Sequence, residues 1–220
     1  MAWALRRGVP VAKIIHVKWF YGLKFYTNRH TLDPRPDTET LVAAVIADCG
    51  VGARPAVLDL GTGTGCIIAA LVKNIHGACG VALDASRAAV RVARRNVRDL
   101  KLNDSVRVIH GNFNNPHAVW DVFDIIVSNP PYIAIGDVRV NIGATYDPRR
   151  ALYAQHNGLA AYESIAKNAR AWLRSGGKIY VEIGDGMMDD VRDIFERAGW
   201  KFGRAERDLG GIIRVLVFEK

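Results

Sequence analysis

The stretch Val57-Leu58-Asp59-Leu60-Gly61-Thr62-Gly63-Thr64-Gly65 decides how this chain of 220 residues folds. Residues 56–60 form a short apolar run that favours a buried strand. The glycines that follow let the backbone turn tightly and come close to a ligand. Residues 66–73 then have the pattern of a helix. This strand, glycine turn and helix predict the first unit of a sheet in which strands alternate with helices.

The same alternation continues to the end of the chain. Strands are predicted at 79–83, 105–110, 123–128 and 178–183, and helices at 86–100, 159–173 and 187–198, with Ser86 as a helix cap and Gly176-Gly177 as a helix stop. The last two strands, 201–208 and 212–218, are joined by Gly210-Gly211, which favours a hairpin. We therefore predict an α/β fold with a seven-stranded, mostly parallel sheet, covered on both faces and closed by an antiparallel hairpin.

The first part of the chain differs from the rest. We expect residues 1–36 to form a small β-hairpin and linker, and residues 37–220 to form the main domain. The aromatic stretch 19–26 alternates and is expected to pair with the segment before it. Asp37 or Thr38 is expected to cap a helix that runs to about Cys49.

Composition narrows the class of protein. The residues are 50% apolar and 24% charged, which is typical of a soluble globular domain. No apolar run approaches the roughly 18 residues of a membrane span, and the first residues lack the features of a signal peptide. The three cysteines have no metal-ligand spacing, so we expect reduced thiols, no metal site and a cytoplasmic location. The net charge of +8 would suit a nucleic-acid partner, but a solvated face of arginines at 87–98 explains much of it.

Polar groups follow several predicted strands and should meet at one edge of the sheet, where open α/β sheets bind ligands. The spacing G-x-G-x-G differs from the G-x-G-x-x-G of dinucleotide sites, and it is preceded by Asp59. An acid near an ammonium group and loop amides near a carboxylate suit an amino-acid tail. Asp84 could accept hydrogen bonds from ribose hydroxyls, while Asn112 and Phe113 could bind the edge and face of adenine. S-adenosylmethionine carries all of these groups.

Asn129-Pro130-Pro131-Tyr132 follows the strand at 123–128. Two prolines fix two φ angles and remove two backbone donors, so this corner is stiff and offers carbonyl oxygens and one side-chain amide. Such a corner can accept hydrogen bonds from a planar NH2 group and can stack a ring over it. The expected chemistry is methyl transfer to a nitrogen of that kind. Glu182, at the end of a later strand, either supports this site from behind or caps a strand end.

These motifs together resemble class I S-adenosylmethionine-dependent methyltransferases that act on a planar nitrogen. With Phe20-Tyr21-Gly22, Pro34-Arg35-Pro36-Asp37-Thr38-Glu39, Tyr146-Asp147-Pro148 and Val181-Glu182-Ile183-Gly184, the chain is similar to the HemK/PrmC family. Those enzymes methylate the glutamine amide of the Gly-Gly-Gln motif in peptide chain release factors. The resemblance implies cofactor contacts from Gly61, Thr62, Gly63, Thr64, Gly65, Asp84, Phe113 and Asn129. It implies catalytic roles for Asn129, Pro130 and Tyr132, and substrate contacts from Asn129, Pro130, Pro131, Tyr132 and Phe20.

The chain departs from this family's pattern at three places. The helical N-terminal domain of the family is largely absent from the sequence given. Asn112 stands where an acid is common, and Ile213 replaces a polar residue before Arg214. An adenine-N6 nucleic-acid methyltransferase would share the glycine loop and the Asn-Pro-Pro-Tyr corner, although the chain has no large segment for target recognition and base flipping. A non-catalytic adapter that binds the cofactor is the other alternative.

Overall fold

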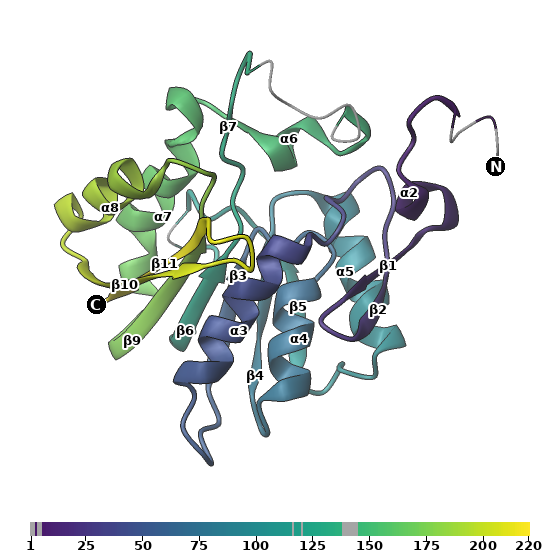
Figure 1. Ribbon diagram of the computed structural model, residues 1–220. Helices are drawn as coiled ribbons and strands as arrows, with labels where there is room; N and C mark the ends of the chain where they lie inside the picture. Colours follow the sequence, from purple (N-terminus) through teal and green to yellow (C-terminus); the bar gives the residue numbers. More distant parts are fainter. Residues whose placement is uncertain (1–2, 4–5, 116, 120, 138–144) are drawn as a thin grey trace.

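A seven-stranded sheet forms the centre of the computed structural model (Figure 1). The structure describes residue 3 and residues 6–115, 117–119, 121–137 and 145–220. The strand order is β10-β11-β9-β6-β3-β4-β5. The strands are β3 (Ala56–Leu60), β4 (Cys79–Asp84), β5 (Val106–His110), β6 (Phe123–Ser128), β9 (Leu173–Glu182), β10 (Lys201–Arg207) and β11 (Ile213–Glu219). Only β11 runs antiparallel to its neighbours β9 and β10, so the predicted sheet and closing hairpin are confirmed.

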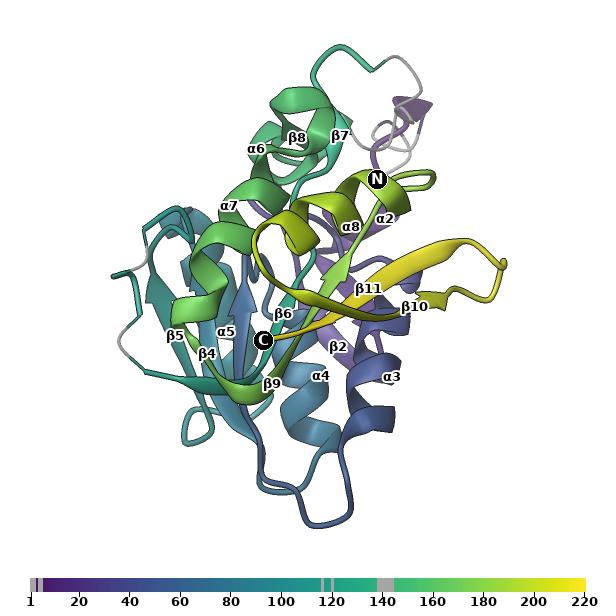
Figure 2. The same ribbon diagram turned by 90° about the vertical axis from the view of Figure 1, so that its left-hand side faces the viewer.

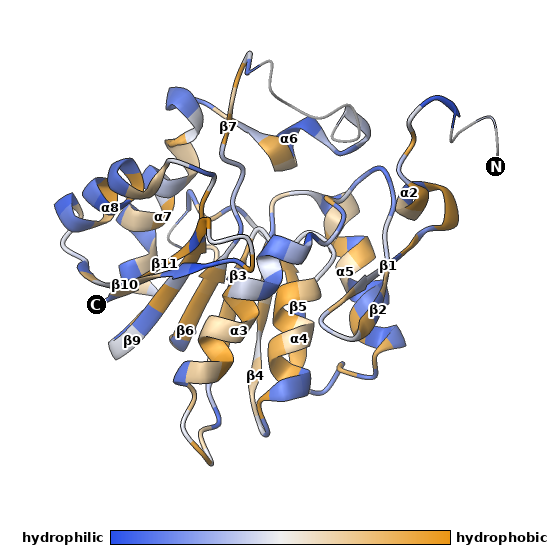
Figure 3. Cartoon of the chain, viewed as in Figure 1, coloured by the Kyte–Doolittle hydropathy of each residue, from blue (hydrophilic) through white to orange (hydrophobic). Residues whose placement is uncertain are grey.

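Helices cover both faces of the sheet, as Figure 2 shows for α3 and α4 on one side and α7 and α8 on the other. Alternate residues of each strand point to opposite faces. Val57 therefore packs into one buried cluster and Leu58 into another. The first cluster lies under α3 (Glu39–Asp48), α4 (Cys66–Asn74) and α5 (Arg87–Asp99), and the second under α7 (Ala160–Asn168) and α8 (Met188–Arg197). In Figure 3 the central strands and α4 are accordingly mostly apolar.

The predicted helix at 159–173 is too long. In the structure α7 ends at Asn168, a 3-10 turn η4 (Ala169–Ala171) follows, and Leu173 already belongs to β9. Gly176 and Gly177 lie inside β9, where the register against β6 is irregular. Gly176 has a φ of +75°, and a Cβ on Gly177 would lie 2.8 Å from the Asp124 carbonyl oxygen. The glycine pair therefore permits a bulge beside β6 and does not stop the helix.

The N-terminal hairpin was predicted with the wrong partner. The aromatic stretch folds back on itself as β1 (Val17–Phe20) and β2 (Leu23–Tyr26), after a short helix α2 (Val11–Ile15). The turn residues Tyr21 and Gly22 have φ values of 48° and 73°, as a tight two-residue hairpin requires. Residues 1–2 and 4–5 of the predicted N-terminal segment lie outside the described residues, and the boundary at residue 36 stays a prediction.

The hairpin packs directly on the main domain. Phe25 belongs to the same buried cluster as Leu41 and Ile68. The Asn96 side chain on α5 accepts from the Tyr26 amide at 2.8 Å and donates to the Tyr26 carbonyl at 3.0 Å and the Thr64 carbonyl at 2.9 Å. One buried amide thus links β2 to α5 and to the glycine loop.

Smaller elements lie above the carboxyl ends of the central strands (Figures 1 and 2). They are β7 (Ile133–Ala134), α6 (Arg149–Leu152), β8 (Tyr153–Ala154) and two 3-10 turns, η1 (Pro36–Thr38) and η3 (His156–Gly158). Thr38 occupies the N-cap position of α3, but its side chain makes no capping hydrogen bond, so the predicted cap is wrong in this respect. Among the described residues, no helix combines the length and apolar character needed to cross a bilayer.

Strands β3 and β4 come unusually close together at Gly80. Gly80 is paired with Val57 in the β3–β4 ladder, and a Cβ at this position would lie 2.3 Å from the Val57 carbonyl oxygen. Gly80→Ala should therefore lower the free energy of unfolding by about 1–3 kcal/mol or more, because the strands must separate. Urea denaturation checks this, with Gly50→Ala as the control, since a Cβ there meets nothing within 4 Å. Equal stability of the two variants would contradict the prediction.

Candidate active site

The carboxyl ends of β3, β4 and β6 and the residues after β5 meet at one cavity of about 360 Å³. Its lining includes Gly61–Thr64, Asp84, Phe113, Asn129 and Pro131. The predicted convergence of the glycine loop, the acid after β4, the aromatic residue after β5 and the Asn-Pro-Pro-Tyr corner is therefore present in the structure. Gly65, Pro130 and Tyr132 do not line the cavity directly.

The glycine loop is fastened to the end of β4. The amides of Gly61 and Thr62 both donate to the Leu83 carbonyl, at 2.9 and 3.0 Å. The Gly63 amide donates to Asp84 Oδ2 at 2.9 Å, and the Gly65 amide donates to the Thr62 carbonyl at 2.8 Å. All three glycines have positive φ values, which an L side chain rarely adopts. Four of the five loop amides are thus already used, so the expectation that these amides receive a carboxylate is wrong for them.

Asp59 lies beneath this loop. Its Oδ2 accepts a hydrogen bond from Thr62 Oγ1 at 2.6 Å, while Oδ1 has no partner among the described residues. Burial raises the pKa of Asp59 to about 7. A buried carboxyl with one unsatisfied oxygen carries a free-energy cost that a cationic partner would offset. Asp59 is fully buried and does not line the cavity, so the predicted contact with an ammonium group stays a prediction.

Asp84 joins the loop to the cavity. Its Oδ1 accepts from the Ser86 amide at 2.7 Å, and its Oδ2 accepts from the Gly63 amide. Burial raises the pKa of Asp84, and these two hydrogen bonds act in the opposite direction. A carboxylate has about four acceptor positions, so Asp84 can hold the loop and still accept from two further hydroxyls. These free acceptor positions fit the hydroxyl groups of the ribose of S-adenosylmethionine.

Phe113 and Asn112 follow β5 as expected. A Cβ on Gly61 would lie 4.0 Å from Phe113 Cε1, so the ring stands beside the glycine loop. Phe113 packs only partly against the second core cluster and lines the cavity. Asn112 also lines the cavity, but its Oδ1 accepts from the Asn114 amide at 2.9 Å. The side-chain oxygen of Asn112 is therefore already hydrogen-bonded within the local turn, and its NH2 group is the part that can bind a ligand.

The Asn-Pro-Pro-Tyr corner begins where β6 ends. Ser128 Oγ donates to the Leu60 carbonyl at 2.8 Å, which ties the end of β6 to β3. Asn129 Nδ2 donates to Thr38 Oγ1 at 3.0 Å, and this turns the Asn129 oxygen to the other side of the amide. Tyr132 lies beside Gly184, where a Cβ would be 3.0 Å from the ring. Burial raises the pKa of the Tyr132 hydroxyl to about 12, so it stays neutral near pH 7.

Phe20 does not reach this site. Its side chain is 1% exposed and belongs to the same core cluster as Leu41, and its ring centroid lies 6.3 Å from that of Phe25. The prediction that Phe20 contacts substrate is therefore wrong in this structure. The alternating pattern of the aromatic stretch explains this burial. When a short hairpin packs against a domain, the side chains on its inward face become part of the hydrophobic core.

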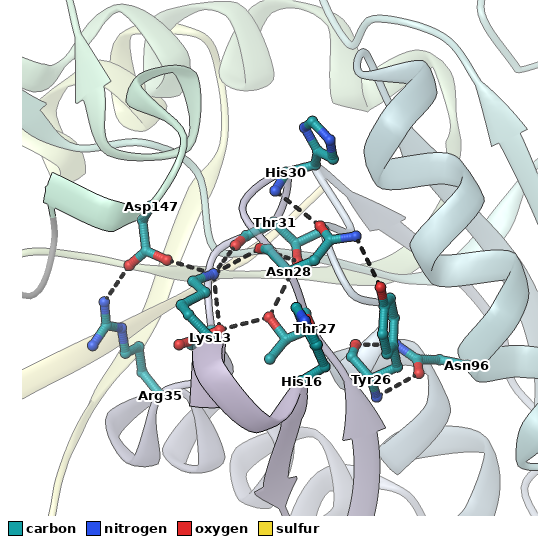
Figure 4. A network of polar contacts seen from close by, with 11 residues as sticks. Lys13, His16, Tyr26, Thr27, Asn28, His30, Thr31, Arg35, Asn96 and Asp147 are labelled. Atoms are coloured by element: carbon teal, nitrogen blue, oxygen red, sulfur yellow. Dashed lines mark hydrogen bonds and ion pairs between the residues drawn. The ribbon is translucent and has the colours of Figure 1, made fainter. Parts of the chain in front are cut away.

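A buried ion network fixes the wall of the cavity (Figure 4). Lys13 Nζ lies 2.9 Å from Asp33 Oδ1 and 2.8 Å from Asp147 Oδ1, and it donates to the carbonyls of Asn28 and Thr31 at 2.8 and 2.5 Å. Arg35 Nη2 lies 2.6 Å from Asp147 Oδ2. The network links α2, the loop before η1 and the segment before α6. Sequence reasoning missed Lys13, because nothing local distinguishes it from a surface lysine of an amphipathic turn.

The described residues contain no group of three or more His, Cys, Asp or Glu side chains that could hold a metal ion. The three cysteines are free thiols, of which Cys66 is buried.

Comparison with known proteins identifies the family. The methyltransferase small domain family matches residues 35–146, which is just over half of the chain. The release factor glutamine methyltransferase of Agrobacterium fabrum is 38% identical, over 97% of this chain and 75% of its own length. This chain belongs to the release factor glutamine methyltransferase family. The predicted resemblance is thus confirmed, and with it S-adenosylmethionine as the cofactor of this methyltransferase fold.

A second relative and a solved structure show how far this family membership extends to activity and to fold. The release factor glutamine methyltransferase of Rhodospirillum rubrum is 41% identical, over 94% of this chain. The chain spans only 64% of that relative's length, so the activity of the whole relative comes to this chain as a proposal. A methyltransferase structure from Pyrococcus furiosus superposes with a TM-score of 0.68 at 18% identity, covering 98% of both chains. That likeness supports the class I methyltransferase fold alone.

Lys13 should be the most sensitive residue of this ion network, which lies behind the cavity residues Asp33 and Arg35. Lys13→Met leaves the carboxylates of Asp33 and Asp147 buried without their shared cation, and we expect a loss of about 3–5 kcal/mol in unfolding free energy. Chemical denaturation measures this. Lys24→Met, on the exposed face of β2, is the matched control and should change stability by less than about 0.5 kcal/mol. Similar losses in both variants would mean that the network contributes nothing specific.

Proposed function

We propose that this chain transfers a methyl group from S-adenosylmethionine to the side-chain amide nitrogen of the glutamine in the Gly-Gly-Gln motif of class 1 peptide chain release factors. The observation that carries the proposal is the corner at Asn129, whose NH2 group is held by Thr38 beside the cavity of the glycine loop and Asp84. The family membership supports the same reaction. Release factors act in translation, so a cytoplasmic location follows from the proposal.

The cofactor would be held by residues at the ends of four strands, β3, β4, β5 and β6. These are the loop residues Gly61, Thr62, Gly63, Thr64 and Gly65, with Asp84, Phe113 and Asn129. When bound, S-adenosylmethionine supplies a methyl group on a positively charged sulfonium, and a neutral thioether is left behind. Asp84 would receive the ribose hydroxyls, and Phe113 would stack on the adenine. Asp59 supports the site from beneath the loop, through Thr62.

The corner would bind and orient the glutamine. An amide nitrogen is a poor nucleophile, because its lone pair is delocalised into the carbonyl group. Asn129 Oδ1 and the Pro130 carbonyl oxygen would accept the two N–H groups, which directs the nitrogen toward the methyl carbon. Pro131 and Tyr132 would contact the plane of the amide. Such positioning can supply roughly 7–11 kcal/mol of the barrier. The proton displaced from nitrogen can leave to water, so the chain needs no strong base.

Methylation of adenine in nucleic acid remains the alternative. The arginines of α5 favour it, because Arg87 and Arg91 are exposed, as is Arg98, which lies 3.6 Å from Asp99. Other arginines of this helix are already engaged: Arg94 donates to the Val108 carbonyl, and the Arg95 guanidinium lies 3.6 Å from the Tyr26 ring centroid. Incubating the chain with a release factor and with an adenine-containing duplex, side by side, separates the two. Mass spectrometry should find one added methyl on the glutamine, whereas methyl-adenine alone would overturn the proposal.

Removing the Asn129 side chain should abolish most of the activity. Asn129→Ala deletes an acceptor aimed at developing positive charge, and we expect kcat to fall about 100- to 1,000-fold, as for loss of one oriented hydrogen-bonding group elsewhere. Asn74→Ala, on the exposed end of α4, is the control for the amide deletion and should keep normal turnover. Near-normal kcat in the Asn129 variant would refute the role of the corner.

Asp84 should act mainly on cofactor affinity. Asp84→Ala removes the proposed ribose acceptor and the partner of the Gly63 amide, so we expect weaker S-adenosylmethionine binding by about one to two powers of ten, as for loss of a charged hydrogen bond. Isothermal titration calorimetry measures the affinity directly. Asp99→Ala, on the exposed end of α5, should bind as the unchanged chain does. Unchanged affinity in the Asp84 variant would remove its assigned role.

A further inference from the structure

Glu182 is a buried acid directly behind the Asn-Pro-Pro-Tyr corner. It ends β9, is 2% exposed and has one carboxyl oxygen, Oε2, with no hydrogen-bond partner among the described residues. Its backbone carbonyl accepts from the Tyr162 hydroxyl at 2.7 Å, so the strand end is fixed from α7. This backbone hydrogen bond is enough to cap the end of the strand, so capping does not explain the side chain of Glu182. The carboxyl group therefore needs another explanation, since burying it without a full set of partners is unfavourable.

The partners of Glu182 are the two residues that set the orientation of the corner. Burial raises the pKa of Glu182, and hydrogen bonding from the side chains of Thr38 and Asn129 acts in the opposite direction. Asn129 Nδ2 also donates to Thr38 Oγ1. Thr38 is 3% exposed, and its hydroxyl has one proton to give. When that proton is directed to Glu182, the lone pairs of Thr38 can only accept, and the group of Asn129 that faces Thr38 must be NH2.

We propose that Thr38 and Glu182 are positioning residues that lock the Asn129 carboxamide with its oxygen toward the substrate amide. This inference rests on the proposed function, and it adds two residues that act through Asn129 without touching the reacting atoms. An inverted carboxamide would present NH2 to the NH2 of the incoming glutamine, and the two donors would repel each other. The lock therefore selects the one orientation in which the corner can bind its substrate.

The lock is sensitive to protonation. Burial raises the pKa of Glu182 to about 7. Below that pH the neutral carboxyl group can donate to Thr38, the Thr38 proton then turns toward Asn129, and the inverted carboxamide becomes favourable. Activity should therefore be lost as the pH falls through about 7. The charged and titratable groups that face Glu182 from other elements are Asp37 from η1, Arg214 from β11, Tyr132 from the corner, Tyr162 from α7 and Cys66 from α4.

None of these neighbours replaces Glu182 in this role. Arg214 lies 3.2 Å from Asp37 and 2.8 Å from Asp208, so its charge is shared between two other carboxylates. Burial raises the pKa of Tyr132, Tyr162 and Cys66, which keeps all three neutral near pH 7. Glu182 is thus the group at the corner that changes charge in the relevant range.

The test is a set of matched variants in the full chain. Thr38→Val removes the hydroxyl at nearly constant shape, Thr38→Ser keeps it, and Glu182→Gln can present either an acceptor or a donor to Thr38. We expect kcat on a bacterial class 1 release factor to fall roughly ten- to a hundredfold in Thr38→Val, as for one lost buried hydrogen bond, and to return to within a few-fold in Thr38→Ser. The pH limb near 7 should disappear in Glu182→Gln. Glu206→Gln, on β10, is the control that should change neither rate nor pH profile.

A second readout does not need turnover. The side-chain NH2 signals of Asn129, identified in 15N NMR spectra by their loss in Asn129→Ala, should shift as the pH passes about 7 and should be exchange-protected above it. Both properties should vanish in Thr38→Val, with circular dichroism confirming that the variant is folded. The proposed lock would be refuted if the NH2 signals of Asn129 did not change with pH or in Thr38→Val. It would also be refuted if Thr38→Val had the same kcat as the unchanged chain. Inactivity of the unchanged chain on the release factor, with the NMR behaviour intact, would instead overturn the proposed function alone.

Discussion

The parallel register of three strands is the constraint on which this site depends. Leu60 of β3 is paired with Leu83 of β4 on one side and with Ser128 of β6 on the other, so the three strands end at one level. The hydrogen bond from Ser128 Oγ to the Leu60 carbonyl fixes that level on the β6 side. The Leu83 carbonyl, which receives two loop amides, fixes it on the β4 side. A slip of one residue would turn Asp84 to the opposite face of the sheet and separate the glycine loop from the corner.

Much of this arrangement can be predicted from the chain itself, because its determinants are local. The period of apolar residues predicts the strands and helices. Because strands that alternate with helices run parallel, their four carboxyl ends share one edge of the sheet. Local rules failed where a residue serves tertiary structure. Gly176-Gly177 has the composition of a helix stop, yet the close approach of the Asp124 carbonyl places it in a strand. Phe20 stands in a motif typical of the substrate pocket, yet docking of the hairpin buries it.

The hydrogen-bond partners of the site could not be predicted from the sequence at all. The glycine loop has five amides, and the pattern alone cannot say that four are satisfied within the protein. The same holds for Lys13 and Asp147, which are far apart in the chain and meet only after α2 and the segment before α6 have both packed (Figure 4). Partners of this kind depend on distances of a few tenths of an ångström, whereas spacing in a sequence fixes only the element and the face.

Asp59 and Glu182 are two buried acids behind the glycine loop and the Asn-Pro-Pro-Tyr corner, and the same question arises for both: why a carboxyl group is buried there. Burial raises the pKa of both Asp59 and Glu182 to about 7, and each has one oxygen without a partner. An apolar side chain of similar volume would avoid this cost at either position. Proteins usually depart from the rules of good packing and polar satisfaction at functional sites. Asp59 is joined through Thr62 to the loop proposed to hold the cofactor, and Glu182 is joined to Asn129. The two departures from good core packing therefore lie behind the two groups that must be held in one orientation.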